Sequence, residues 1–224
     1  MAQDQVFEKA SFCSQAEKNK GFRQMTQIIP AVLAKNLKEL RFQLSKVRWA
    51  EKVQIDVADG VFVNAKTLNF AVLKKHLPEM RIQLHLMVVD PEKYITALAD
   101  EIIFHVETGK DIIDKLKSRK IIPGIAFNPE TDVNDYKCLI KKAGVAQVMT
   151  VKPGRMGGKF LKSQLKKVQQ IKKINPRIKI GIDGGINSRT IRFVKQKPDF
   201  IVVGSALQRA ENPEKEFLFL LNKC

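Results

Sequence analysis

Two carboxylates and an amide interrupt the apolar segment KVQIDVADGVFV (residues 52–63). Gln54 and Asp56 are two positions apart, so their side chains lie on the same face of an extended strand. A carboxylate among apolar neighbours must be hydrogen-bonded, paired with a cation, bound to a metal or used in catalysis. Asp59 and Gly60 are typical of the turn that follows a strand. We therefore treat Asp56 as a candidate group for proton transfer or metal binding.

Further polar residues stand at the ends of other short apolar runs. Gln83, His85 and Met87 share one face of such a run, and Asp183 ends the segment KIGID immediately before a pair of glycines. The remaining residues of this kind are His105, Glu107 and Asn128. Carboxylates can transfer protons, and carboxylates together with imidazole can bind a divalent metal. These residues form a candidate site if the fold brings the ends of the runs together.

The apolar runs are rich in β-branched residues and indicate strands at residues 27–34, 52–57, 81–88, 101–107, 121–127, 146–151, 179–183 and 200–206. The segments between them have helical periodicity. One helix face is formed by Leu37, Leu40, Leu44 and Val47, and another by Leu161, Leu165, Val168 and Ile171. The second pattern predicts that the solvent side carries Lys162, Lys166, Lys167 and Lys173.

Eight buried strands that alternate with amphipathic helices predict an α/β fold, a single (β/α)8 TIM barrel over residues 27–224. Residues 1–26 precede the first strand, and we expect an extra N-terminal helix or arm there, with a disordered tail as the alternative. In such barrels the chemistry occurs at the C-terminal ends of the strands. The architecture therefore predicts that these strand-end polar residues lie toward one mouth of the barrel; they are Gln54, Asp56, His85, His105, Glu107, Asn128 and Asp183.

The composition indicates a soluble protein: hydrophobic residues make up 44% of the chain, and no apolar run is long enough to span a membrane. The N-terminus lacks the apolar core of a secretory signal, which predicts a cytoplasmic protein. The three cysteines (Cys13, Cys138 and Cys224) lie far apart and predict free thiols rather than disulfides or a cysteine metal site.

The formal net charge of +17 is unevenly distributed, because residues 136–182 contain thirteen Lys or Arg and no Asp or Glu. Such a stretch can attract phosphorylated ligands, nucleic acid or an acidic partner, or it can be a solvated lysine-rich surface. No aromatic platform or nucleic-acid motif accompanies the charges, so a nucleic-acid partner is not expected.

Eight segments of the chain resemble the ribulose-phosphate 3-epimerase family, in the family's order and over about residues 28–207. They read IIPAVLAKNLKEL, QIDVADGVFV, LHLMVVDPEKYI, IIFHVET, IAFNPET, VMTVKPGRMGGKF, IDGGIN and VVGSAL. The resemblance implies an isomerase that interconverts D-ribulose 5-phosphate and D-xylulose 5-phosphate or a related ketose phosphate. It also implies a small-molecule sugar phosphate as the ligand and a homo-oligomer.

The resemblance assigns the two proton-transfer groups to Asp56 and Asp183. It also implies a divalent metal (Zn, Fe, Co or Mn) held by two histidines and the same two aspartates. His85 matches one histidine, but Gln54 stands where the family has the other. An amide oxygen is a weaker ligand than imidazole for zinc or ferrous iron. Gln54 is therefore either a weak metal ligand or a hydrogen-bond partner of Asp56 or the substrate.

The resemblance also assigns the phosphate side of the site. Backbone N–H groups can bind the phosphate at Gly184, Gly185, Gly204 and Ser205, and a loop over the ligand contains Gly154 and Gly157. Met156 and Gly158 replace a glycine and a glutamine of that loop, and Lys152 and Arg155 add charge there.

The apolar cap of the family's site is matched in part, by Met87 and Met149. Ala31 replaces a substrate-contacting serine, and Ala58 replaces another methionine of the cap. We expect these two alanines to enlarge the pocket.

Three alternatives remain open at this point. Gln54 and the two alanines also fit a diverged, metal-free sugar-phosphate-binding barrel. A synthase or decarboxylase of the same superfamily would need a lysine in a D-x-K-x-x-D pattern, whereas this chain reads DVAD at residues 56–59. The third alternative is polyanion binding through the basic stretch at residues 137–179.

Overall fold

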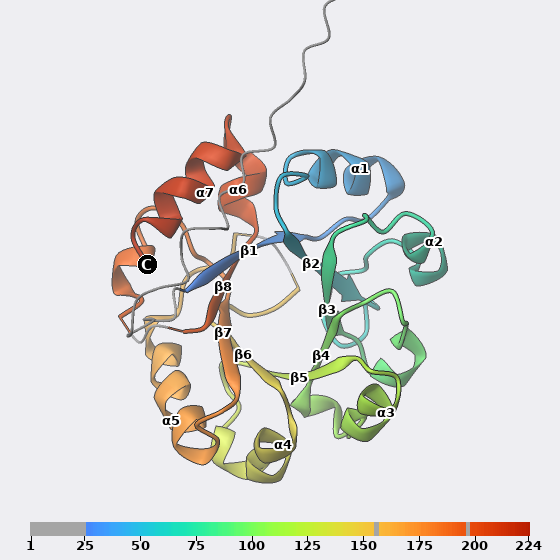
Figure 1. Cartoon of the computed structure of the whole chain (residues 1–224), viewed down its shortest axis with the longest axis vertical. Helices are drawn as coiled ribbons and strands as arrows, with labels where there is room; N and C mark the ends of the chain where they lie inside the picture. The colour runs from blue at the N-terminus through green and yellow to red at the C-terminus, as the bar shows by residue number, and fades with distance from the viewer. Residues whose placement is uncertain (1–25, 155–156, 196–197) are drawn as a thin grey trace, which may run out of the picture.

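The computed structural model describes residues 26–154, 157–195 and 198–224. Eight parallel strands form a closed barrel in the order of the sequence, with β1 next to β8 (Figure 1). The strands are β1 (Gln27–Val32), β2 (Lys52–Ala58), β3 (Arg81–Met87), β4 (Glu101–His105), β5 (Ile122–Phe127), β6 (Val145–Met149), β7 (Lys179–Asp183) and β8 (Phe200–Val203). All eight predicted strands are confirmed, with bounds that shift by a few residues.

Helices surround the barrel on the outside (Figure 1). They are α1 (Leu37–Ser45), α2 (Phe70–Lys74), α3 (Ile113–Ser118), α4 (Lys137–Lys142), α5 (Lys166–Ile174), α6 (Ser205–Arg209) and α7 (Pro213–Leu221). Short 3-10 helices occupy Pro91–Tyr94, Val106–Thr108, Val133–Tyr136, Lys162–Leu165 and Ile191–Phe193. Among the described residues only a 3-10 helix follows β3 and β7, so the alternation of strand and α-helix is incomplete at these two places. The (β/α)8 barrel itself is confirmed.

The core has two layers because alternate residues of each strand face opposite sides. The outward-facing residues pack against helix residues such as Leu40, Leu116, Ile140 and Ile171. A smaller cluster fills the barrel interior and consists of Ile29, Ala31, Ile103, Ala126, Val145, Phe200 and Val202. The interior is therefore a packed core, and it supports the residues at the barrel mouth from below.

Gly181 makes room for the largest interior side chain. A Cβ atom at this position would lie 2.0 Å from the ring of Phe200. The ring therefore fits inside the barrel only because β7 has no side chain there. Two residues further along the same strand, and thus on the same face, is Asp183.

Charged groups also enter the barrel, at the end opposite the predicted site. Lys52 and Glu101 form an ion pair of 2.7 Å, and both side chains are buried. Gln83 donates a hydrogen bond of 2.6 Å to the same carboxylate. Burial lowers the pKa of Lys52, although the charge of Glu101 and the hydrogen bond to it oppose this effect.

The prediction that Lys167 faces solvent is wrong. Lys167 is buried in α5, and its Nζ donates hydrogen bonds to the carbonyl oxygens of Asn128 (2.7 Å) and Pro129 (2.9 Å). The loop after β5 thus supplies two acceptors that replace water around the ammonium group. Burial lowers the pKa of Lys167 against the opposing charges of Glu107 and Glu130.

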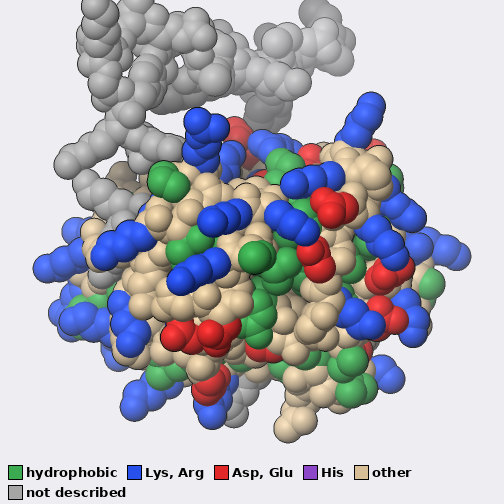
Figure 2. All heavy atoms as spheres, turned by 90° about the horizontal axis from the view of Figure 1, so that it is seen from below, with side chains coloured by type: hydrophobic (Ala, Val, Ile, Leu, Met, Phe, Trp, Pro, Cys, Tyr) green, Lys and Arg blue, Asp and Glu red, His purple; other side chains and the backbone are tan. Residues whose placement is uncertain are grey.

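Lys and Arg side chains are spread over the face shown in Figure 2, with Asp and Glu side chains among them. Cys138 and Cys224 are free thiols, as predicted, and Cys13 lies outside the described residues. The predicted N-terminal helix or arm falls almost entirely on residues 1–25, which are also outside the described part and leave it a prediction. No helix among the described residues is long and apolar enough to cross a bilayer.

Candidate active site

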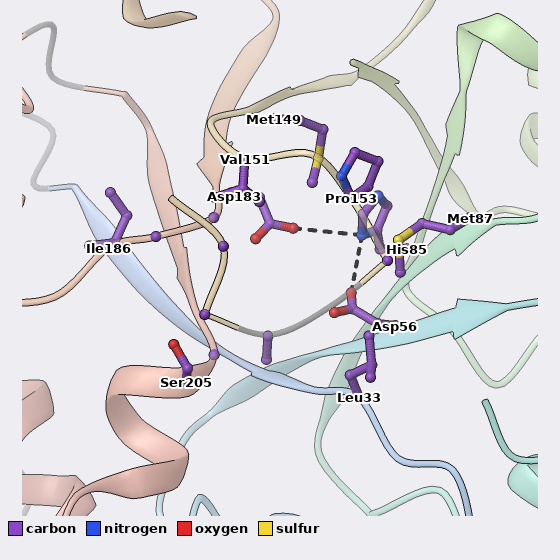
Figure 3. Close-up of a pocket in the computed structure, with 17 residues that line it drawn as sticks. Leu33, Asp56, His85, Met87, Met149, Val151, Pro153, Asp183, Ile186 and Ser205 are labelled. Atoms are coloured by element: carbon purple, nitrogen blue, oxygen red, sulfur yellow. Dashed lines mark hydrogen bonds and ion pairs between the residues drawn. The ribbon is translucent and has the colours of Figure 1, made fainter. Parts of the chain in front are cut away.

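A pocket opens at the C-terminal ends of the strands and brings together nearly all predicted site residues (Figure 3). The predicted residues that line it are Asp56, His85, Met87, Met149, Gly154, Gly157, Asp183, Gly184, Gly185, Gly204 and Ser205. Ala31 and Gly158 line it as well, together with Leu33, Val151, Pro153 and Ile186. Gln54 is fully buried and does not line the pocket; it contacts Asp56 and Asp183.

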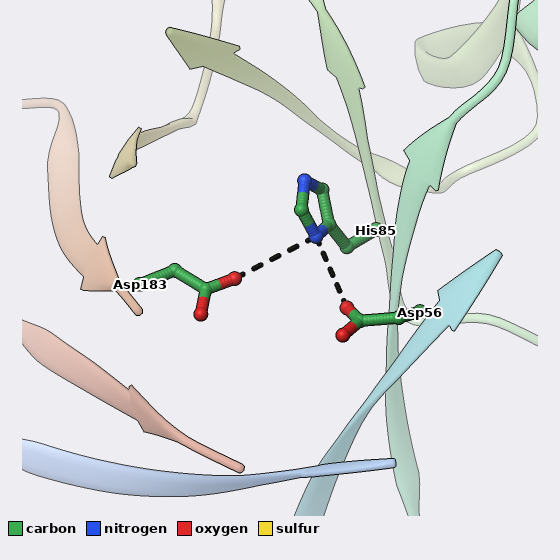
Figure 4. A group of neighbouring side chains, drawn as sticks. All are labelled: Asp56, His85 and Asp183. Carbon is green, nitrogen blue, oxygen red and sulfur yellow. Dashed lines mark hydrogen bonds and ion pairs between the residues drawn. The ribbon is translucent and has the colours of Figure 1, made fainter. Parts of the chain in front are cut away.

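Asp56, His85 and Asp183 form a compact group inside this pocket (Figure 4). The register of β2 and β3 pairs Asp56 with His85 on neighbouring strands. His85 Nδ1 lies 3.0 Å from Asp56 Oδ1 and 3.6 Å from Asp183 Oδ2. The imidazole nitrogen therefore faces both carboxylates, although the aspartates come from strands far apart in the sequence.

Gln54 connects the two carboxylates. Its Nε2 donates hydrogen bonds of 2.9 Å to Asp56 Oδ1 and 2.9 Å to Asp183 Oδ2. Its Oε1 is buried and has no hydrogen-bond partner among the described residues. The sequence allowed Gln54 to be a hydrogen-bond donor or a metal ligand, and this arrangement uses it as a donor to both aspartates.

Gln147 belongs to the site and was missed in the sequence. It is fully buried on β6, and its Nε2 donates a hydrogen bond of 2.8 Å to Asp183 Oδ2. A weak signal was present, because Gln147 and Met149 are two positions apart in the run AQVMTV and share a face. Asp183 thus accepts amide N–H groups from two strands.

The surroundings of Asp183 and His85 shift the pKa values of both side chains. Burial and the charge of Asp56 raise the pKa of Asp183 to about 7, against the opposing charge of His85. Burial alone lowers the pKa of His85, but the hydrogen bond to Asp56 and the charges of Asp56 and Asp183 outweigh it and raise the pKa. Near neutral pH Asp183 can therefore hold or release a proton, as a general acid or base must.

One oxygen of each carboxylate remains available for chemistry. The hydrogen bonds from Gln54, His85 and Gln147 all end on Asp56 Oδ1 or Asp183 Oδ2. No described residue donates a hydrogen bond to Asp56 Oδ2 or Asp183 Oδ1. The two carboxyl groups can thus exchange protons with a ligand while their other oxygens stay anchored.

The same group of residues fits a divalent cation. Ligand atoms of Asp56, His85 and Asp183 lie within 4.8 Å of one another. Rotating the amide of Gln54 by half a turn would place its unpartnered Oε1 where Nε2 now contacts both carboxylates. The residues could then offer one nitrogen and three oxygen ligands, a set that zinc, iron, cobalt and manganese accept.

His105 and Glu107 lie behind His85, away from the pocket lining. His85 Nε2 is 2.9 Å from His105 Nε2, and His105 Nδ1 is 3.1 Å from Glu107 Oε2. Burial lowers the pKa of His105 to about 4, more strongly than the carboxylate of Glu107 raises it. Burial raises the pKa of Glu107, but hydrogen bonds from His105, Thr131 and Asn128 outweigh it and lower the pKa.

Glycines after β7 form one side of the pocket. Gly184 (φ +114°) and Gly185 (φ +69°) have left-handed backbone conformations, and a Cβ at Gly184 would lie 2.3 Å from Val151. Thr150 Oγ1 holds this turn through hydrogen bonds to the carbonyl oxygens of Asp183 (2.9 Å) and Gly184 (2.6 Å). Ser205, at the start of α6, lies across the pocket from His85 (Figure 3).

Described residues of the loop after β6 line one part of this pocket. Gly154 has φ +102°, and a Cβ there would lie 2.8 Å from Val63. Lys152 is exposed and lies 3.7 Å from Glu130, whereas Arg155 and Met156 fall outside the described residues. Ala31 lines the pocket, whereas Ala58 is buried and does not line it, and the expected enlargement of the pocket stays a prediction.

The predicted turn at Asp59 and Gly60 is confirmed. Asp59 Oδ1 accepts hydrogen bonds from the backbone N–H groups of Val61 (2.8 Å) and Phe62 (2.9 Å), and Gly60 has φ +82°. Asp59 Oδ2 accepts a third, of 2.8 Å, from Val89 N–H in the loop after β3. Asp59 thus connects two loops at the barrel mouth.

Solved structures support the fold independently. The chain superposes on 3-hexulose-6-phosphate synthase from Salmonella typhimurium with a TM-score of 0.61 at 19% identity, covering 88% of this chain and 98% of that one. A Mycobacterium tuberculosis tryptophan synthase structure matches with a TM-score of 0.63 at 12% identity, covering 89% and 93%. At these identities the matches show a shared fold alone.

Sequence comparisons are more specific. The ribulose-phosphate 3-epimerase of Schizosaccharomyces pombe is 30% identical over 211 residues, which cover 88% of this chain and 92% of that protein. The enzyme of the same name from Methanocaldococcus jannaschii is 31% identical, covering 82% and 84%. The model of the ribulose-phosphate 3 epimerase family matches residues 27–208, which include all eight strands. The chain therefore belongs to the ribulose-phosphate 3-epimerase family.

Proposed function

We propose that the protein is an isomerase that interconverts D-ribulose 5-phosphate and D-xylulose 5-phosphate by proton transfer at the third carbon. The observation that carries this proposal is the pair of carboxyl groups, Asp56 and Asp183, each with one oxygen free of hydrogen bonds from described residues. Both line one pocket, and they come from different sides of the barrel.

Inversion at a carbon next to a ketone requires one group to remove a proton and another to deliver one to the opposite face. Asp56 and Asp183 perform these two roles, and they exchange roles in the reverse direction. Without a cation, Gln54 and His85 hold Asp56, while Gln54 and Gln147 hold Asp183. Fixed carboxylates keep the reacting atoms aligned, which lowers the barrier to each transfer.

Asp56, His85 and Asp183 would hold a divalent metal, with Gln54 Oε1 as a weak fourth ligand. When bound, such a cation supplies positive charge beside the enediolate oxygens that form between the two proton transfers. The N–H groups of Gln54 and Gln147 hold the carboxylates in the absence of the cation. Gln54 would have to turn its amide on metal binding.

The phosphate of the substrate would lie against Gly184, Gly185, Gly204 and Ser205. Glycine lets the backbone approach an anion closely, and backbone N–H groups donate hydrogen bonds to phosphate oxygens. Gly154 and Gly157 belong to the loop that covers the phosphate and sugar. Met87 and Met149 pack on the apolar side of the ligand, and both are buried in the pocket wall.

The proposal is tested by incubating the purified protein with D-ribulose 5-phosphate and following D-xylulose 5-phosphate by NMR. Zinc, iron, cobalt and manganese are added separately to chelator-treated protein. We expect conversion with at least one metal and its loss in Asp183→Asn. No conversion under any of these conditions would refute the proposed activity.

A second candidate function follows from the direction in which Gln54 points. Because Gln54 donates to both carboxylates, the site is complete without a metal, which favours a sugar-phosphate-binding protein without turnover. That function predicts saturable binding of ribulose 5-phosphate by calorimetry in the presence of a chelator, with no product formed. Gln54→His would then restore metal binding.

We also propose that the protein acts in the cytoplasm as a homo-oligomer. Support comes from the family and from the rice relative named as a cytoplasmic isoform, which is 29% identical over 84% of this chain. Sedimentation of the purified protein would test the oligomer, and fractionation of the source cells would test the location.

A further inference from the structure

A line of hydrogen-bonded side chains runs from the pocket into the barrel wall, and the proposed reaction uses only its first member. It begins at His85, continues through His105 and Glu107, and ends at the backbone N–H of Asn128 and the hydroxyl of Thr131. Both imidazoles are buried, and the ring of Phe62 packs 4.8 Å from the ring of His105. Water therefore has little access to the two histidines.

Glu107 is an acceptor of hydrogen bonds on both of its oxygens. Oε1 accepts the backbone N–H of Asn128 at 2.8 Å and the hydroxyl of Thr131. Oε2 lies 3.1 Å from His105 Nδ1. An ionised carboxylate can only accept, so the proton of this last hydrogen bond belongs to His105 Nδ1.

The protons on the two histidines follow from that assignment. A neutral imidazole that carries its proton on Nδ1 has an acceptor at Nε2. His105 Nε2 therefore accepts, and the hydrogen bond of 2.9 Å between the rings requires a proton on His85 Nε2. The nitrogen of His85 that remains to be decided is Nδ1, which faces Asp56 and Asp183.

We propose that Glu107 and His105 are positioning residues that fix the tautomer of His85, so that Nδ1 is the nitrogen that can give up its proton and bind a cation. The inference rests on the proposed metal-ligand role of His85. Neither residue touches the pocket. They act through His85, by preventing the tautomer that would keep Nδ1 protonated and Nε2 bare.

The far end of the line is held by other buried contacts. The carbonyl oxygen of Asn128 accepts a hydrogen bond of 2.7 Å from Lys167, while the N–H of Asn128 donates to Glu107. Thr108 caps the same turn with a hydrogen bond of 2.8 Å to the carbonyl oxygen of His105. These contacts hold the Glu107 carboxylate where its Oε2 can accept a hydrogen bond from His105 Nδ1.

Glu107→Gln tests the assignment because an amide has one donor end and one acceptor end. The amide oxygen would take the two donors that now bind Oε1, and the NH2 group would face His105 Nδ1. His105 Nδ1 must then accept, so its proton moves to Nε2 and the hydrogen bond to His85 reverses. Nε2 of His85 becomes the bare nitrogen, and Nδ1 retains its proton.

The readout is NMR of isotope-labelled imidazole nitrogens in chelator-treated protein. The chain has only three histidines, and His76→Gln assigns the third. In the wild type we expect protons on His105 Nδ1 and His85 Nε2 and none on His105 Nε2; in Glu107→Gln we expect a proton on His105 Nε2. A proton on His105 Nε2 in the wild type would overturn the proposal, and this result needs no variant to fold.

The second readout is zinc affinity by calorimetry. Loss of such a supporting group typically weakens metal binding by about 10–100-fold, and we expect a decrease in this range for Glu107→Gln. Glu130→Gln removes the same charge from an exposed position nearby and should leave affinity unchanged. Equal affinities in Glu107→Gln and Glu130→Gln would contradict the proposal. Failure of the protein to epimerise ribulose 5-phosphate, with the expected protonation pattern intact, would refute the proposed activity alone.

Discussion

Replacing Gln54 by leucine should destabilise the metal-free protein, because Nε2 is hydrogen-bonded to both carboxylates of the site. The two hydrogen bonds are 2.9 Å long and end on Asp56 Oδ1 and Asp183 Oδ2. Hydrogen bonds to charged groups contribute about 1.5–3 kcal/mol each. Leucine has a similar volume, so the substitution removes these bonds without leaving a large cavity.

The substitution also removes an unfavourable group, which offsets part of this loss of stability. Gln54 Oε1 is buried without a partner among the described residues, and an unsatisfied group of this kind costs about 1–3 kcal/mol. The expected net decrease in the free energy of unfolding is therefore about 2–3 kcal/mol. For a chain of this size that corresponds to a Tm lower by roughly 4–12 °C.

Thermal unfolding in the presence of a chelator measures this difference. Gln169→Leu, at an exposed position of α5, is the matched control and should change stability by less than about 0.5 kcal/mol. If Gln54→Leu unfolds at the same temperature as Gln169→Leu, Gln54 does not hold the carboxylates in solution.

Three further predictions concern other parts of the barrel. Burial raises the pKa of Asp59, but hydrogen bonds from backbone N–H groups outweigh it and lower the pKa, so this carboxylate stabilises the fold above its unfolded pKa of about 3.8. Asp59→Asn should therefore lower Tm at pH 7, and the difference from wild type should vanish as the pH falls through the folded-state pKa. Gly184 has φ +114°, and in Gly184→Ala the new Cβ would lie 2.3 Å from a methyl group of Val151. We therefore expect the free energy of unfolding to fall by about 1–3 kcal/mol and KM to rise. Gly109→Ala, with φ +68° and open space, isolates the backbone effect, and an equal loss there would contradict the steric argument. Lys52→Met should lower the free energy of unfolding by about 3–5 kcal/mol, because it leaves the carboxylate of Glu101 buried and unpaired. The double variant Lys52→Met/Glu101→Leu should recover most of this stability. No recovery in chemical denaturation would refute the reasoning.

The strands and the site were predictable because both follow from short-range patterns. Runs of β-branched residues mark buried parallel strands, and Asp56 and Asp183 stand at the ends of such runs. The fold rule that places strand ends at one mouth then brought His85 beside them. The turn after β7 was predictable too, because a pair of glycines follows the strand and both have positive φ; their role in phosphate binding stays a prediction.

Contacts between distant residues were not predictable in the same way. The strand pattern places Gln147 inside the barrel, but its partner Asp183 lies on the next strand at a register that the sequence does not reveal. Lys167 lies beside buried Val168 on α5, and only the loop after β5 explains why its ammonium group turns inward. Periodicity indicates which way a side chain points, and hydrogen-bond partners depend on the packing of separate elements.

The hydrogen bonds of His105 illustrate the same limit. His105 stands two residues before Glu107, but the hydrogen bond between their side chains was seen only in the structure. The contact with His85 on the neighbouring strand came only from the fold. Once both distances are known, the proton positions follow from donor and acceptor rules alone.

The central claim is that Asp56 and Asp183 exchange protons with the third carbon of a ketose phosphate. The most direct measurement is NMR of that carbon after D-ribulose 5-phosphate is incubated with metal-supplemented protein in deuterated water. The account predicts one solvent deuterium at the third carbon of the D-xylulose 5-phosphate product and no epimerisation by Asp56→Asn or Asp183→Asn. Product without deuterium, or wild-type rates in either variant, would contradict it.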